Sequence, residues 1–143
     1  MKVDVDENTY GYTHPSLQRL RNELSRRIDH KVGVYQIQTH DICCGYLIID
    51  HSNNDATWSG DGFRTDNDGE GGSGFRAAEA LLRLFNAMPD VICTEPISEW
   101  KASQEQFDKI IEDNGLDSEH MCPKYSMSDR YPDYLRGILA TGA

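Results

Sequence analysis

The sequence predicts an α+β domain, in which a helix, three antiparallel strands and a second helix form a two-layer sandwich with a helical C-terminal extension. Two stretches of apolar residues at helical spacing flank a region rich in β-forming side chains. Within that region, residues 42–50 form a nearly continuous apolar run, which is typical of a central strand. We divide the chain into a loose acidic arm (1–12), an αβββα core (13–88) and an extension (89–143).

The first helix begins near Pro15, with Thr13 or His14 at the cap, because proline fits the first helical turn. Its buried stripe consists of Leu17, Leu20, Leu24 and Ile28.

Three strands follow this helix. Residues 32–39 and 42–50 are separated by a tight turn at 40–41, which predicts a hairpin. A cluster of turn-forming residues at 52–55 leads into a glycine-interrupted third strand at 56–64, typical of an edge. The order predicts an antiparallel meander.

Residues 65–74 are predicted to be a glycine-rich loop, followed by a second helix that Pro89 ends. The apolar face of this helix consists of Ala78, Leu81, Leu82, Phe85 and Met88. In the extension, Ser98 or Ser103 caps a helix that ends at Gly115, and a short last helix lies around 131–139.

The net charge of −10 is unevenly distributed. Residues 13–33 carry +3 and the remainder of the chain −13. We expect the basic side chains of the first helix to point largely to solvent, where they would contact a partner or a second copy of the chain. These residues are Arg19, Arg21, Arg26 and Arg27.

The acidity permits three interpretations: adaptation to high salt, ordinary solubility, or imitation of nucleic acid by a surface that binds a basic protein. It argues against a general nucleic-acid coat protein. The N-terminus lacks the apolar core of a signal peptide and no run is long enough to span a bilayer, so we expect a cytoplasmic protein without membrane contact.

The glycine-rich segment is the predicted ligand site, because backbone N–H groups at the start of a helix bind anions. A phosphate-bearing small molecule such as a nucleotide would be held by backbone and arginine, with an aromatic ring stacked on it. The predicted site residues are Trp58, Phe63, Arg64, Gly69, Gly71, Gly72, Ser73, Gly74, Phe75 and Arg76. A flexible loop without a ligand is the alternative.

Metal binding is a weaker hypothesis. Asp66, Asp68 and Glu70 match the first positions of a calcium loop, but its closing glutamate is replaced by Ala77. A zinc site of His40, Cys43, His120 and Cys122 has irregular spacing. We therefore predict no metal and no cofactor.

Catalytic signals are also sparse. Asp50 and His51, at a predicted strand end, offer an acid–base pair, and no serine or cysteine has a local activation motif.

Residues 14–88 resemble the double-stranded-RNA-binding domain. The similarity consists of the helix–three strands–helix order, Pro15-Ser16-Leu17, and Gly69-x-Gly71-x-Ser73-x-x-x-Ala77 before the second helix. The resemblance implies that fold. The family's RNA-gripping lysines correspond to Gly74, Phe75 and Ala78, so it does not imply binding of double-stranded RNA.

Together these patterns favour a small non-enzymatic binding protein for a nucleotide or another phosphate-bearing ligand. The alternative is an acidic interaction module, such as an inhibitor of viral or mobile-element origin that blocks a nucleic-acid-binding enzyme.

Overall fold

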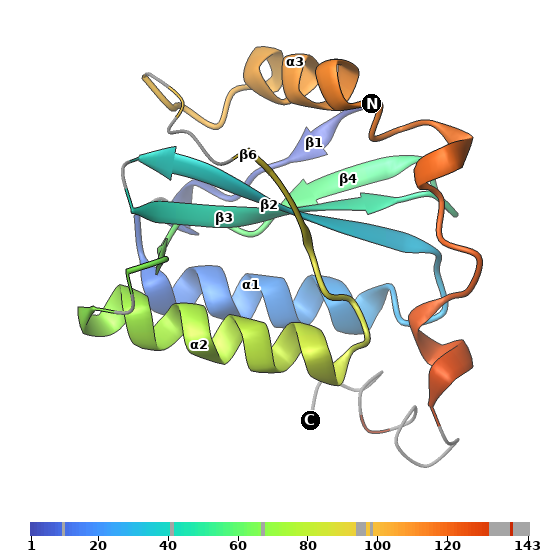
Figure 1. Ribbon diagram of the computed structural model, residues 1–143, viewed down its shortest axis with the longest axis horizontal. Helices are drawn as coiled ribbons and strands as arrows, with labels where there is room; N and C mark the ends of the chain where they lie inside the picture. The colour runs from blue at the N-terminus through green and yellow to red at the C-terminus, as the bar shows by residue number, and fades with distance from the viewer. Residues whose placement is uncertain are drawn as a thin grey trace.

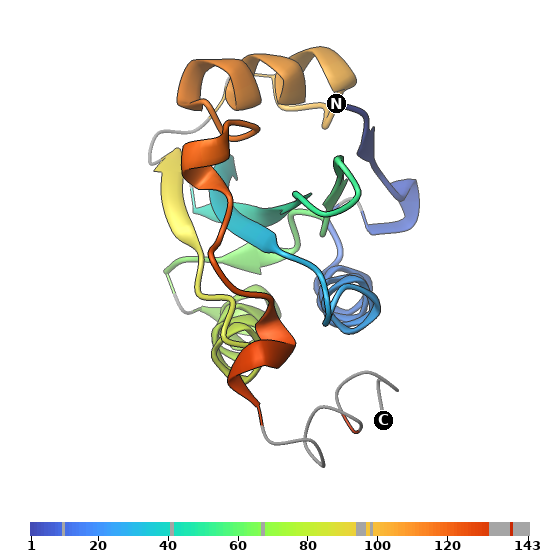
Figure 2. The same cartoon turned by 90° about the vertical axis from the view of Figure 1, so that its right-hand side faces the viewer.

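A six-stranded mixed sheet lies between helices on both of its faces (Figure 1). The computed structural model describes residues 1–9, 11–40, 42–66, 68–93, 97, 99–131 and 138. Helices α1 (Thr13–Arg26) and α2 (Gly69–Leu84) lie side by side on one face, and α3 (Gln104–Asn114) covers the other. The turned view in Figure 2 shows the same three layers.

The centre of the sheet is an antiparallel meander. Strands β2 (Val32–His40), β3 (Cys43–Asp50) and β4 (Asp55–Trp58) pair in succession. The short β5 (Phe63–Arg64) pairs with the start of β3. The two edge strands of the sheet are both paired in parallel. β1 (Val3–Asp4) lies beside β4, and β6 (Asp90–Cys93) lies beside β2.

The α+β class is confirmed, but the prediction of three strands is wrong. Residues 1–9 are not a loose arm, because they contain β1 and a 3-10 turn, η1 (Glu7–Thr9), with Val3 and Thr9 buried. Nor does the segment after residue 88 lie outside the sheet, since β6 joins it. Because α3 adds a helical layer on the other face of the sheet, the molecule has three layers and not the two that were predicted.

Helices α1 and α2 bury one side of the sheet. Leu20, Leu24 and Ile28 from the predicted stripe meet Ala78 and Leu82 in a single apolar cluster with the strands. Three members of the predicted stripes differ. Leu17 and Leu81 are only partly buried. Met88 is exposed, since α2 ends at Leu84, before Pro89.

Helix α3 buries the other side with aromatic side chains. Trp58, Trp100 and Phe107 pack with ring centroids 5.3–5.4 Å apart. Ser103 and Gln106 form the predicted capping box and Gly115 the left-handed C-cap, with φ of 60°. Beyond α3 lie two 3-10 turns, η2 (Glu119–Met121) and η3 (Met127–Arg130).

The helix predicted around 131–139 lies outside the described residues apart from Tyr131 and Ile138. Among the described helices, none combines the length and the apolar character needed to cross a bilayer.

Candidate functional site

Two of the aromatic rings expected to stack on a ligand belong to the core. Trp58 is 2% exposed, within the cluster beneath α3, and Phe63 is fully buried beneath α1 and α2, with its ring centroid 5.4 Å from that of Tyr46. Phe75 is partly buried against the same cluster as Phe63. Burial excludes Trp58 and Phe63 from base stacking, so the predicted aromatic side of the site is wrong for these two residues.

The predicted glycine loop is instead the beginning of α2. The helix starts at Gly69, which has a φ of 62°, and the Gly72 N–H already donates to the Asp68 carbonyl. A Cβ on Gly71 would approach Arg64 Cγ to 2.6 Å, and one on Gly74 would strike Thr13 of α1. These glycines therefore allow α2 to pack closely against α1 and β5.

Arg64 already has acidic neighbours. Its guanidinium contacts Asp66 through two bonds, at 3.1 and 2.7 Å, and Asp68 lies 3.9 Å away. The hydrogen bond from Arg64 lowers the pKa of Asp66. Both groups are accessible to solvent, where such a pair is weak. Arg76 lies one turn along α2 from Gly72 and donates to Ser73 Oγ at 3.2 Å.

A cavity of about 280 Å³ lies where the first turns of α1 and α2 converge with β5 and the β2–β3 turn. It contains two of the predicted site residues, Arg64 and Gly71, and six that sequence patterns did not bring together. Its lining residues are Gly11, Thr13, His40, Cys43, Asp61, Gly62, Arg64 and Gly71.

Asp61 is the most unusual group in this cavity, because its side chain is 4% exposed. One carboxylate oxygen accepts a hydrogen bond from the Gly11 N–H at 2.7 Å. The other lies 3.8 Å from His40 Nε2, too far for a hydrogen bond. The cavity thus combines a buried carboxylate, an imidazole and a guanidinium with the starts of two helices.

Comparison with known proteins found no matching family model, no matching curated protein and no matching solved structure.

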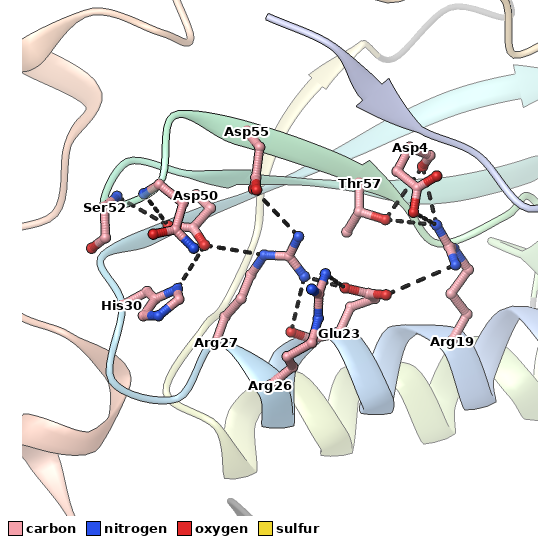
Figure 3. A network of polar contacts seen from close by, with 11 residues as sticks. Asp4, Arg19, Glu23, Arg26, Arg27, His30, Asp50, Ser52, Asp55 and Thr57 are labelled. Carbon is pink, nitrogen blue, oxygen red and sulfur yellow. Dashed lines mark hydrogen bonds and ion pairs between the residues drawn. The ribbon is translucent and has the colours of Figure 1, made fainter.

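A second polar cluster joins the end of α1 to the β3–β4 hairpin (Figure 3). Asp50, fully buried, lies 3.2 Å from Arg27 Nε and 2.7 Å from His30 Nδ1, and it accepts the Ser52 and Asn53 N–H groups. Arg27, 3% exposed, also contacts Glu23 and Asp55. Because the buried carboxylate and the buried guanidinium lie within ion-pair distance of each other, we assign this cluster a structural role.

The predicted solvent-facing arginine surface is wrong for two of its four residues. Arg27 belongs to the buried cluster, and Arg19 bonds to the Trp58 carbonyl, Thr57 and Asp4. Arg26 is 64% exposed and pairs with Glu23. Burial alone would raise the pKa of Glu23, but the hydrogen bonds from Arg26 and Arg27 outweigh it and the pKa is lowered. Arg21 lines a shallow apolar groove between α1 and α2.

The metal hypotheses gain no support from the geometry. Within the described residues, no group of three or more His, Cys, Asp or Glu side chains is arranged to hold a metal ion. His40 and Cys43 face each other across β2 and β3, whereas His120 lies in η2 and Cys122 directly follows it, near the opposite end of β2. Asp66 and Asp68 face Arg64.

His51 does not form an acid–base pair in a cavity. Its Nε2 atom is buried without a hydrogen-bond partner, and this burial lowers its pKa despite the attraction of Asp50 and Asp117. The neutral imidazole is therefore the form that the fold accommodates.

The lowered pKa of His51 predicts a pH-dependent loss of stability. Protonation favours the unfolded chain once the pH falls below about 6.5, the ordinary histidine value, and the loss continues down to the lowered native pKa. His51→Gln removes this contribution. Its free energy of unfolding relative to the wild type should therefore rise as urea titrations move from about pH 7.5 to about pH 5.5. A constant difference over this window would show that His51 titrates equally in both states.

Proposed function

We propose that the chain is a binding protein for a small phosphate-bearing molecule that also carries hydroxyl groups, such as a sugar phosphate or a nucleotide. The observation that supports this function is the cavity, in which Arg64 and the first turn of α2 lie close to the buried Asp61. A phosphate binds to guanidinium and helix N–H groups, and a carboxylate accepts from a sugar hydroxyl.

Asp66 would compete with the phosphate of the ligand for Arg64. The ion pair between Asp66 and Arg64 is accessible to solvent, so little free energy is lost when a phosphate replaces the carboxylate. Asp61 has a different role. Its second oxygen is not hydrogen-bonded to His40, so it remains available to a donor on the ligand.

Isothermal titration with ribose 5-phosphate and with inorganic phosphate tests this function. Arg64→Gln should weaken both ligands about tenfold, since a charge-assisted hydrogen bond contributes about 1.5–3 kcal/mol. Asp66→Asn should strengthen both several-fold by releasing Arg64. Asp61→Asn should weaken only the sugar phosphate, because inorganic phosphate lacks the sugar hydroxyl.

Arg76→Gln is the matched control, because Arg76 has the same charge and lies on α2 outside the cavity lining. Its affinities should remain those of the wild type. Absence of saturable binding by either ligand, or equal weakening by Arg64→Gln and Arg76→Gln, would contradict the proposed site.

A further inference from the structure

Cys43 lies in the same cavity, and phosphate binding does not use it. It is half-buried and is the register partner of His40 across β2 and β3. A shift in register between Gln38 and His40 places the imidazole opposite the cysteine at the end of the hairpin. The buried Asp61 carboxylate lies 3.8 Å from Nε2 of this imidazole.

A cationic side chain and a helix N-terminus lie close to Cys43, whose register partner on β5 is Arg64. Arg64 is close enough to interact electrostatically with it, and the first turn of α2 borders the same cavity. Cationic side chains and helix N-termini stabilise a thiolate, which is the nucleophilic form of cysteine.

The adjacent cysteine provides an internal contrast. Cys44 points into the cluster beneath α1 and α2, is fully buried, and burial raises its pKa to about 12. The two neighbouring thiols lie on opposite faces of one strand. Cys43 is half-buried and lines the cavity, whereas Cys44 is fully buried in the core.

We propose that Cys43 is a reactive thiol that exchanges with low-molecular-weight disulfides. The Cys43 thiolate attacks one sulfur of the disulfide, a new sulfur–sulfur bond forms, and the original one breaks. The electron pair leaves with the second sulfur, which is released as a thiolate and takes up a proton. His40 accepts the Cys43 proton before attack, and Asp61 stabilises the resulting imidazolium.

Such a mixed disulfide would occupy the cavity and exclude the phosphate ligand. This consequence depends on the proposed function, whereas the exchange itself does not. A molecule built in this way would bind its ligand in the reduced state and lose it under oxidising conditions.

The test is incubation of the whole protein with glutathione disulfide, followed by mass spectrometry of the intact chain and of its peptides. We expect one glutathione per chain, on Cys43, with addition to Cys122 at least tenfold slower. Cys122 is the control within the same chain, because it is also half-buried but lies in the structure outside this cavity. Cys43→Ser should abolish the fast addition, and Cys122→Ser should leave it unchanged.

His40→Gln should slow the addition about tenfold at neutral pH, and the difference from the wild type should diminish at alkaline pH, where the thiol ionises unaided. Circular dichroism of this variant excludes misfolding as the cause. Equal rates at Cys43 and Cys122, or an unchanged rate in His40→Gln, would overturn the proposal.

The two proposals fail separately. Ribose 5-phosphate binding without reaction at Cys43 would disprove the thiol exchange alone. Reaction at Cys43 in a protein that binds no phosphate would disprove the proposed function alone. If both hold, the glutathionylated protein should no longer bind ribose 5-phosphate, and reduction should restore binding.

Discussion

Replacement of Asp50 by asparagine is expected to lower the free energy of unfolding by about 3–5 kcal/mol, the cost of removing one partner of a buried ion pair. Asp50 is fully buried and lies 3.2 Å from Arg27 Nε and 2.7 Å from His30 Nδ1. The amide retains an acceptor for the Ser52 and Asn53 N–H groups but leaves the buried guanidinium with less negative charge. Urea denaturation of Asp50→Asn provides the measurement.

Asp55→Asn is the matched control for this prediction. Asp55 contacts the same guanidinium, at 3.4 Å, but its side chain is 49% exposed. Its loss should cost less than about 1 kcal/mol, as for other exposed pairs. The double variant Arg27→Met/Asp50→Leu should recover part of the lost stability, because apolar side chains can replace a buried ion pair. An equal loss of unfolding free energy in Asp50→Asn and Asp55→Asn would contradict the prediction that the buried ion pair matters more than the exposed one.

Gly45→Ala is expected to destabilise the protein by about 3 kcal/mol, the upper part of the range for overpacking a core. A methyl group at this position would lie 2.5 Å from the buried Trp58 ring and would clash with the Gly60 carbonyl. After β4 the chain passes close to Gly45 before it pairs with β3 again as β5. In this passage Ser59 Oγ accepts the Tyr46 N–H at 2.9 Å and donates to the Gly60 carbonyl at 2.8 Å.

Gly69→Ala separates packing from backbone effects. Gly69 has a φ of 62° but open space around its missing side chain. Its replacement should therefore cost only the left-handed strain, about 1–2 kcal/mol. A cost at Gly45 no larger than at Gly69 would contradict the close contact of Gly45 with Trp58 and Gly60. Since Asp61 follows Gly60 directly, Gly45→Ala should also weaken ribose 5-phosphate binding.

Features with local sequence signals were predictable. The capping box of Ser103 and Gln106 and the terminating Gly115 define α3 within one short segment. The apolar run before Asp50 identified the central strand, because a strand covered on both faces needs apolar residues on both. The strands β1 and β6 have only two and four residues, and their parallel pairing depends on distant segments. No local pattern reveals such pairs.

The burial of Arg27 does have a signal in the sequence, which lies in its position and not in its charge. It lies seven positions after Leu20 and three after Leu24, which places it on the apolar stripe of α1. The cavity as a whole had none, because His40 and Cys43 flank the β2–β3 turn, whereas Asp61 and Arg64 come from the segment after β4. Glycines at 71 and 74 resembled a phosphate loop, but a close contact between helices also requires glycine.

The N-terminal strand is connected directly to α3. Gln104 accepts from the Val3 N–H and donates to the Met1 carbonyl, both at 2.9 Å, and the start of the chain lies beside α3 in both views of the fold (Figures 1 and 2). These bonds join residues about a hundred positions apart. During synthesis, β1 therefore leaves the ribosome long before its partner in α3 exists. We expect the meander and α1 to fold first, with β1 joining the sheet only after α3 is made.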